Sequence, residues 1–272
     1  TEVMPTTTPD PSETREVKAM NRKATTATAR RTIAILPLGA HEYHGPHLPL
    51  DTDTLIAEAI ASRLKAALPD GLDVVFLDTD PIGYSIEHAD REGTRSLAWK
   101  DAIEGWIDVC ENLAASGVRK VILLNAHGGN SPLLTIVATE ARVRFDMLCV
   151  STSWSRFGVP DDVIAPEDKA IDIHGGLIET SVMLALHPDM VDMAAARNFP
   201  SRQSDFIREY THLRAYGSHA FGWKMSDLNP DGAAGDASAA TTEKGERLLA
   251  HAVKGLVELV VDVDRFDAGL LF

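Results

Sequence analysis

The chain alternates between short apolar runs and longer segments in which apolar residues recur at helical spacing. Four runs are apolar on consecutive residues, which is typical of parallel strands covered on both faces. They predict strands at about 32–37, 73–77, 120–124 and 147–151. The segments between them predict helices at about 54–68 and 99–115, and a third that ends near 144. This alternation predicts an α/β fold, a three-layer α/β/α sandwich around a mostly parallel central sheet.

The N-terminus and the second half of the chain are patterned differently. Residues 1–28 hold few large apolar side chains and are rich in Thr and Pro, so we expect a flexible arm. One further helix is expected to open within segment 174–181 and to run to about 186, and another is expected at about 241–263. Between them, region 198–240 is rich in Gly, Ser and Asp, and is expected to be an irregular lid or a subunit contact. We find no internal repeat or clear linker, so residues 29–272 are expected to form a single domain.

Composition narrows the possible partners. The 272 residues include 44% hydrophobic and 24% charged residues, an ordinary globular composition. The net charge of −14 argues against nucleic acid or an anionic membrane surface as a partner, because both require a basic patch. No window of 18 apolar residues predicts a membrane span. The two cysteines belong to no metal or redox motif, so a reducing, cytoplasmic location is expected.

One loop concentrates the residues that could carry chemistry. Residues 41–53 hold three histidines, two aspartates and one glutamate, and a glycine and two prolines forbid a regular helix there. Glu42 and His44 alternate, so they project to one side of an extended segment, while Asp53 returns after the turn, where a carboxylate could bridge two ions. Nitrogen and oxygen ligands without thiolate suit catalytic zinc, manganese or iron. The alternative is a polar surface loop that happens to be rich in histidine.

Two later segments add candidate ligands. His127 follows the third expected strand and precedes two glycines, so no side chain there would crowd an ion, although it could merely cap the next helix. Glu179 is flanked by apolar residues, where an unpaired carboxylate would be costly. The alternative for Glu179 is a simple interaction with the helix dipole. Because ligands of such folds bind beyond the carboxyl ends of the strands, His127 and the 41–53 loop are expected to face one crevice.

These segments resemble the creatininase-type metal-dependent amidohydrolases. The resemblance covers about residues 32–250 in the family's order. It rests on Glu42-x-His44-Gly45-Pro46-His47-Leu48-Pro49 through Thr52-Asp53, on Gly83-Tyr84-Ser85-x-Glu87-His88, on Asn125-Ala126-His127-Gly128-Gly129-Asn130, on His174-Gly175-Gly176 with Glu179-Thr180-Ser181, and on Ala240-Thr241-Thr242-Glu243-Lys244-Gly245. The first and third motifs are specific enough that chance is implausible.

The resemblance implies a ligand set and an assembly. Glu42, His44, Asp53, His127 and Glu179 would hold two divalent ions per subunit, with Asp53 bridging them. Zinc is favoured, with manganese or iron as alternatives. The resemblance also implies a three-layer α/β fold, a creatininase-like catalytic domain over residues 29–272, and a homo-oligomer, with a hexamer favoured.

The chain departs from the creatinine-hydrolysing members of the family. They carry a glutamate at the position of Gly129, and tryptophan-containing sequence where Ala170 and Ile171 stand here. Arg91 replaces a residue that is apolar in other members. We therefore expect the fold and the hydrolytic metal site to be kept, but creatinine itself not to be the natural small-molecule substrate.

The expected reaction is hydrolysis of a non-peptide C–N bond, in a cyclic amide or a formamide, by a hydroxide bound to two metal ions. Three carboxylates and one hydroxide would balance the four positive charges. His174 is the candidate acid that protonates the leaving amine, because an ordinary histidine pKa lies near neutrality, and Glu179 completes the catalytic pair. Two alternatives stay open: hydrolysis of the C–C bond of a cyclic ketone in polyol breakdown, and a non-enzymatic, metal-stabilised oligomer.

Other residues receive supporting roles. Tyr84, Ser85, Arg91 and Gly128 are expected to contact substrate, and an inward-pointing Arg91 would favour an anionic one. His47, Glu87 and His88 are expected to orient the ligand imidazoles or to line the mouth of the crevice.

Overall fold

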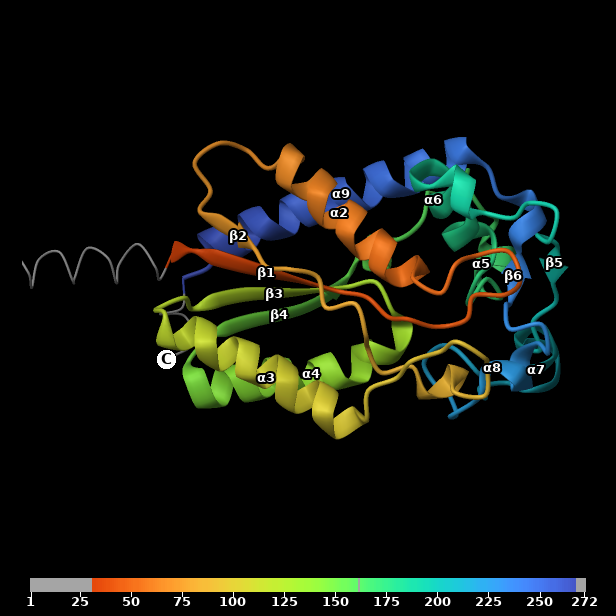
Figure 1. Cartoon of the computed structure of the whole chain (residues 1–272), viewed down its shortest axis with the longest axis horizontal. Coiled ribbons are helices and arrows are strands. Elements are labelled where there is room, and N and C mark those ends of the chain that lie inside the picture. The colour runs from red at the N-terminus through yellow and green to blue at the C-terminus, as the bar shows by residue number, and fades with distance from the viewer. Residues whose placement is uncertain (1–30, 161, 268–272) are drawn as a thin grey trace, which may run out of the picture.

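Four parallel strands form the central sheet of the computed structural model, which describes residues 31–160 and 162–267 (Figure 1). Their order in the sheet is β2-β1-β3-β4. The strands are β1 (Ile33–Leu38), β2 (Val74–Phe76), β3 (Lys120–Asn125) and β4 (Leu148–Ser153). Helices cover both faces, so the predicted α/β fold is confirmed. The arm predicted for residues 1–28 lies outside the described residues.

The two faces of the sheet have separate cores. Helices α2 (Thr52–Ala67), α6 (Leu177–Leu186) and α9 (Thr242–Arg265) cover one face, and α3 (Trp99–Ala115) and α4 (Ser131–Phe145) cover the other (Figure 1). Successive residues of β1 alternate between them: Ile33 and Ile35 pack into the first core, and Ala34 and Leu36 into the second. This burial on both faces explains why the strand reads as continuously apolar.

The loops at the carboxyl edge of the sheet are tied together by one buried asparagine. Asn130 is fully buried, and its side-chain amide donates to the carbonyl of Gly39 at 3.1 Å. Its carbonyl oxygen accepts from the backbone N–H of Tyr84 at 2.9 Å. The same amide also donates to the side chain of Asn125 at the end of β3. The three loops that follow β1, β2 and β3 are therefore held in one fixed arrangement.

The segment predicted to be irregular contains short elements. Strands β5 (Asn198–Phe199) and β6 (Gly235–Asp236) pair antiparallel, and two helices, α7 (Gln203–Glu209) and α8 (Met225–Leu228), lie between them. Ala215, Met225 and Leu228 form a small core of their own. The longer connection after β4 contains one further short helix, α5 (Pro166–Lys169).

Most predicted boundaries differ from the observed ones by one to three residues. Helix α2 begins at Thr52, two residues before the start predicted from its apolar repeat, because the polar residues of its first turn are buried at the sheet edge. Strand β4 continues to Ser153, beyond its apolar run, because it pairs with β3 along its whole length. In the described part of the chain, no helix is long and apolar enough to cross a membrane.

The contact between α6 and α9 generates a stability prediction. A Cβ at Gly245 of α9 would overlap the backbone carbonyl of Ser181 in α6, so Gly245→Ala must push the helices apart. We expect a loss of about 1–3 kcal/mol in the free energy of unfolding, the usual cost of overpacking. The matched control is Gly105→Ala on the exposed face of α3, where a Cβ meets nothing within 4 Å. This control should gain about 0.5–1 kcal/mol. Urea unfolding of the two variants measures whether the free energy of unfolding falls in Gly245→Ala and rises in Gly105→Ala. Equal changes in the two variants would contradict the packing argument.

Candidate metal centre

Three buried histidines at the sheet edge are oriented by backbone carbonyls. In each, one ring nitrogen bonds to a carbonyl oxygen and therefore carries the hydrogen, which leaves a lone pair on the other nitrogen. The bonds run from His44 Nδ1 to Glu42 O at 3.0 Å, from His127 Nε2 to Tyr84 O at 2.9 Å, and from His174 Nε2 to Tyr43 O at 2.8 Å. All three free nitrogens then point toward buried carboxylates.

The distances between these nitrogens and the carboxylates match two adjacent cation positions. His127 Nδ1 lies 3.2 Å from both Glu42 Oε1 and Asp53 Oδ2. His44 Nε2 lies 3.3 Å from Asp53 Oδ1 and 3.8 Å from Glu179 Oε2. Tetrahedral zinc with bonds of about 2.0–2.1 Å separates its ligand atoms by roughly 3.3 Å. Asp53 thus offers one oxygen to each position, as a bridging carboxylate would.

The carboxylates lack the partners that buried charges need. Glu42 is fully buried, and neither of its carboxylate oxygens has a hydrogen-bond partner; Oδ2 of Asp53, which is 1% exposed, has none either. An unpaired ionised carboxylate is very costly to bury. Orphaned oxygens beside oriented histidine lone pairs therefore fit a divalent cation pair. His44, Asp53 and Thr52 come from the start of α2 and the loop before it, so the first turn of that helix is built around this cluster.

The pKa values show how strongly the cluster calls for positive charge. Burial lowers the pKa of His44, but Asp53, Glu179 and Glu42 outweigh burial and raise it from 6.5 to about 10. The same balance, with Glu42 and Asp53 dominant, holds the pKa of His127 well above its usual value. Burial raises the pKa of Glu42, but neighbouring imidazoles led by His127 bring it well below its ordinary value. Without metal, protons take the place of the cations.

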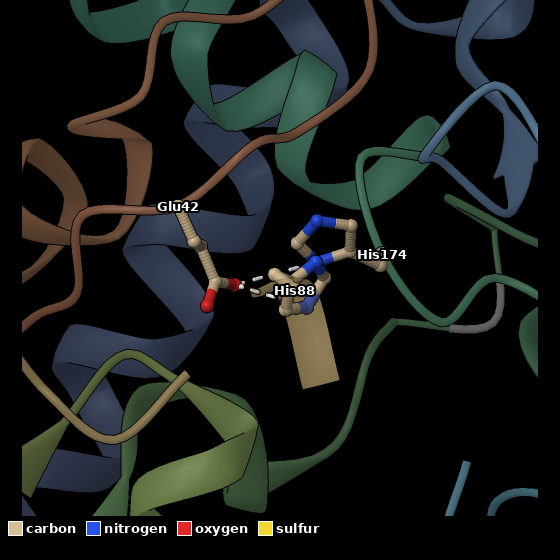
Figure 2. Close-up of side chains that lie close together, drawn as sticks. All are labelled: Glu42, His88 and His174. Atoms are coloured by element: carbon tan, nitrogen blue, oxygen red, sulfur yellow. Dashed lines mark ion pairs between the residues drawn. The ribbon is translucent and has the colours of Figure 1, made fainter. Parts of the chain in front are cut away.

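Two further histidines face the same glutamate. Figure 2 shows the side chains of His88 and His174 beside Glu42, with His88 Nε2 at 3.5 Å and His174 Nδ1 at 3.7 Å from Glu42 Oε1. The His88 and His174 rings lie 4.2 Å apart between centroids. The sequence analysis expected an ordinary histidine pKa near neutrality for His174, whereas burial and then His44 and His88 lower its pKa well below 6.5. His174 is therefore neutral in this arrangement.

A cavity of about 350 Å³ opens above the cluster. Glu42, Asp53, His127, His174 and Glu179 lie along it, so four of the five predicted metal ligands share one space with the predicted catalytic histidine. Its other walls are mainly apolar, and no lysine or arginine among residues 31–160 and 162–267 lines it. These walls are formed by Tyr84, Ile86, Gly128, Gly129, Pro132, Ile173, Ala215, Tyr216, Ala220, Phe221, Gly222 and Trp223, together with the polar side chains of Glu87 and His88.

The residues predicted to contact substrate separate into two groups. Tyr84 and Gly128 line the cavity, but Ser85 and Arg91 do not. Ser85 is fully buried, with its Oγ 3.3 Å from His127 Nε2, so it supports a histidine instead. Arg91 lies beside Asp90, with Nε 3.9 Å from Oδ1 of that carboxylate. The position of Arg91 therefore does not support the predicted contact with an anionic substrate.

The three residues predicted to support the ligands also differ. His88 and Glu87 both line the cavity, and Glu87 Oε1 lies 3.6 Å from His127 Nε2. His47 faces away: it bonds to Thr180 Oγ1 at 2.9 Å and stacks on Phe199. Burial lowers the pKa of His47 to about 4. His47 therefore anchors α6 to the 41–53 loop and does not touch a proposed ligand imidazole.

Gly129 leaves the space that Glu87 fills. A Cβ at Gly129 would overlap Glu87 Oε1 and would crowd His127 Nε2 and the Tyr84 carbonyl. Two roles were not assigned from the sequence: Asn130 as the tie between loops, and the Tyr43 carbonyl as the anchor of His174. The Asn125–Asn130 motif carried a signal for the first, because buried asparagines at strand ends bond to loop backbone. Nothing in the sequence signals the second, since the two residues are 131 positions apart.

Comparison with known proteins gives one family throughout. The sequence model of the creatininase family, described as creatinine amidohydrolase, matches residues 18–260. A mycofactocin precursor peptide peptidase from Mycolicibacterium smegmatis is 31% identical over 230 residues, which cover 84% of each chain. A creatinine amidohydrolase from Pseudomonas putida is 28% identical over 243 residues, covering 84% of this chain and 88% of the relative.

Solved structures agree with the sequences. A structure described as creatininase with Mn matches with a TM-score of 0.68 at 25% identity, covering 90% of this chain and 95% of the other. A mutant creatininase of Zn–Zn type matches with a TM-score of 0.69 at the same identity and coverage. Creatininase structures therefore carry manganese or zinc.

The pKa shifts generate a prediction about metal binding. Nearby carboxylates raise the pKa of His44 to about 10 and hold the pKa of His127 well above its usual value, so both rings favour the protonated form in the metal-free protein. A cation needs the lone pairs, so binding should release about two protons per chain. Calorimetric titration with zinc at pH 8, in two buffers of different ionisation enthalpy, measures this release. A binding enthalpy independent of the buffer would contradict the assignment of these histidines.

Proposed function

The chain belongs to the creatininase family, which includes hydrolases acting on C–N amide bonds, and from this premise we propose that it hydrolyses a small amide using two divalent ions. Glu42, Asp53 and His127 would hold one ion, and His44, Asp53 and Glu179 the other. The observation that carries the proposal is the convergence of oriented histidine lone pairs on orphaned buried carboxylates at the floor of a cavity.

The proposed chemistry divides between the ions and the side chains. When bound, a pair of divalent ions lowers the pKa of water and polarises a carbonyl group. The task of the chain is to place the carboxylates of Glu42, Asp53 and Glu179 around the ions and to keep the histidine tautomers fixed. The carbonyls of Glu42 and Tyr84 do this for His44 and His127. The apolar walls exclude other water, which strengthens every charge interaction inside.

His174 is the proposed proton carrier. Its Nε2 donates to the Tyr43 carbonyl, and its low pKa leaves Nδ1 unprotonated and directed at the cluster. Nδ1 can therefore first accept the proton that the attacking water loses. The resulting imidazolium can then donate that proton to the nitrogen of the leaving amine. This sequence keeps the role expected for His174 but reverses its starting state, from acid to base.

The walls of the cavity support a substrate class. In the described part of the chain, the lining holds no lysine or arginine, and its one carboxylate outside the proposed ligand set is that of Glu87. A phosphate or a free carboxylate far from the cluster would therefore find no counter-charge. Ile86, Tyr216, Phe221 and Trp223 offer apolar and aromatic surface instead. We infer an uncharged or cationic amide that bears an apolar or aromatic group, whether cyclic, a formamide or the end of a short peptide.

Short peptides are included among the proposed substrates because of a specific comparison. A relative 31% identical over most of both chains is named as a peptidase, so the restriction to non-peptide bonds expected from the sequence is not retained in the proposal. A polyol-derived cyclic ketone, the alternative chemistry, is less compatible with apolar walls. A merely structural metal site does not require an adjoining cavity of about 350 Å³. The homo-oligomer, with a hexamer favoured, and the cytoplasmic location stay predictions from the resemblance.

The direct test is a substrate panel on metal-loaded protein. We expect amine release from at least one of three groups, namely cyclic amides including creatinine, N-formyl amines with aromatic groups, and short peptides with apolar or aromatic ends. Asp53→Asn should lose bound metal and at least about 100-fold in kcat/KM, because both ions depend on this residue. Asp51→Asn, in the same loop but away from the cavity, is the matched control and should retain both. Turnover by a cyclic ketone alone would overturn the amide assignment.

A second variant tests the role of His174. His174→Gln should keep two ions but lose about 100-fold or more in kcat, the usual share of a proton-transferring side chain. Metal analysis and kinetics on the same sample measure both quantities. His251→Gln, whose ring bonds to the Phe157 carbonyl outside the cavity lining, serves as the control. If His174→Gln instead retained one ion per chain, the residue would be a ligand beside His44 and Glu179.

A further inference from the structure

We propose that Glu42, His88 and His174 form a third cation site, which shares Glu42 Oε1 with the ion proposed beside His127 and whose occupation blocks turnover. The proposal rests on the proposed function, because it assigns His174 to the same reaction. Ligand atoms of the three side chains lie within 4.8 Å of one another, and all three are buried. Figure 2 shows them directed toward one another from separate parts of the chain.

The separations suit a metal ion of the zinc type. His88 Nε2 and His174 Nδ1 lie 3.5 and 3.7 Å from Glu42 Oε1. Ligand atoms around tetrahedral zinc are roughly 3.3 Å apart, so a small contraction would complete the site. Two imidazole nitrogens and one carboxylate oxygen, with the fourth position open to the cavity, favour zinc or another borderline transition metal over magnesium or calcium.

The bonding state of His88 supports a ligand role. His88 is 1% exposed, and its Nδ1 is buried without a hydrogen-bond partner, so no carbonyl fixes its tautomer as in the other three histidines. Its Nε2 has only the Glu42 carboxylate as a charged neighbour within 4 Å among the described residues. Both Glu42 oxygens also lack hydrogen-bond partners. A buried imidazole and a buried carboxylate, each incompletely satisfied, thus face one point.

The tautomer of His174 links occupation to inhibition. Its Nε2 hydrogen is committed to the Tyr43 carbonyl, so Nδ1 is the atom that would carry the reaction's proton. A cation on Nδ1 removes that lone pair. Excess metal should therefore stop turnover without moving the residues that wall the substrate cavity.

Charge sets the order of filling. The proposed pair of ions is balanced by Glu42, Asp53, Glu179 and one hydroxide, whereas Glu87 is the only other carboxylate that lines the cavity. A third dication therefore adds uncompensated positive charge close to two others. It should bind after them and more weakly, so that the two states separate in a titration.

The experiment is a zinc titration of the full chain, with bound metal measured by equilibrium dialysis and elemental analysis alongside the hydrolysis rate. We expect two tightly bound ions, then a third at higher free zinc, with the rate falling as the third binds. His88→Gln should bind two ions, and its inhibitory zinc concentration should rise at least about tenfold. Even the loss of a hydrogen-bond partner of a metal ligand typically costs about that much affinity.

Two controls ensure that the number of bound zinc ions reports on the proposed site. His212 and His219 form a pair on the outside, with ring centroids 5.6 Å apart, that could bind zinc adventitiously. The titration is therefore done in a His212→Gln/His219→Gln background, which should still bind the third ion. His174→Gln supplies an independent variant, expected to keep two ions and lose the third, in case His88→Gln folds poorly.

The outcomes are distinguishable. The third site would be overturned if a third ion bound with unchanged affinity in both His88→Gln and His174→Gln. It would also be overturned if the His212→Gln/His219→Gln protein bound only two ions while excess zinc still inhibited it. Binding of two ions with no turnover of any amide would instead overturn the proposed function, because the stoichiometry is read independently of the rate.

Discussion

The structure depends on the burial of three carboxylates that cannot share a dry space unless positive charge lies between them. Glu42 and Asp53 offer ligand atoms within 4.8 Å of each other and of His127. Two unit charges at that distance repel by about 3–4 kcal/mol even at an effective dielectric constant of 20. Without cations the cluster takes up protons, which is why the pKa values of His44 and His127 are raised. The fold thus builds a demand for cations into its sheet edge.

The backbone, together with the side chains, determines where positive charge can be bound in the cluster. A buried imidazole could turn either nitrogen toward a carboxylate, but the carbonyls of Glu42, Tyr84 and Tyr43 decide which nitrogen of each ring faces the cluster. Those carbonyls belong to loops that Asn130 ties to Gly39 and Tyr84. The position of the lone pairs is therefore set by hydrogen bonds at the ends of β1 and β3, before any ion binds. Such orientation by surrounding groups is a general requirement of metal sites.

The fold could be predicted from the sequence to a large extent, and the site to a smaller one. Continuous apolar runs such as Val121–Leu124 identify strands buried on both faces, and the parallel sheet follows from their spacing. The site could be predicted only as a set of ligand types, because the relation of His174 to Tyr43 and of Glu87 to Gly129 depends on tertiary contacts. Short elements such as α8 were missed because four residues carry no periodicity. The pKa of His174 was misjudged because burial beside His44 and His88 cannot be read from composition.

The segment that was hardest to predict from the sequence also supplies the aromatic wall of the cavity. Tyr216, Phe221 and Trp223 come from the region between α7 and α8, and they wall the cavity opposite the cluster. This region is held by its own hydrogen bonds: Gln203 accepts from the N–H of Ala215 and donates to the Tyr216 carbonyl, and the Trp223 indole donates to the Ala215 carbonyl. Because none of these bonds involves the cluster, the wall can change without disturbing the ions. A buried cluster that favours cations and an independently held wall would allow one metal centre to serve amides of different shape.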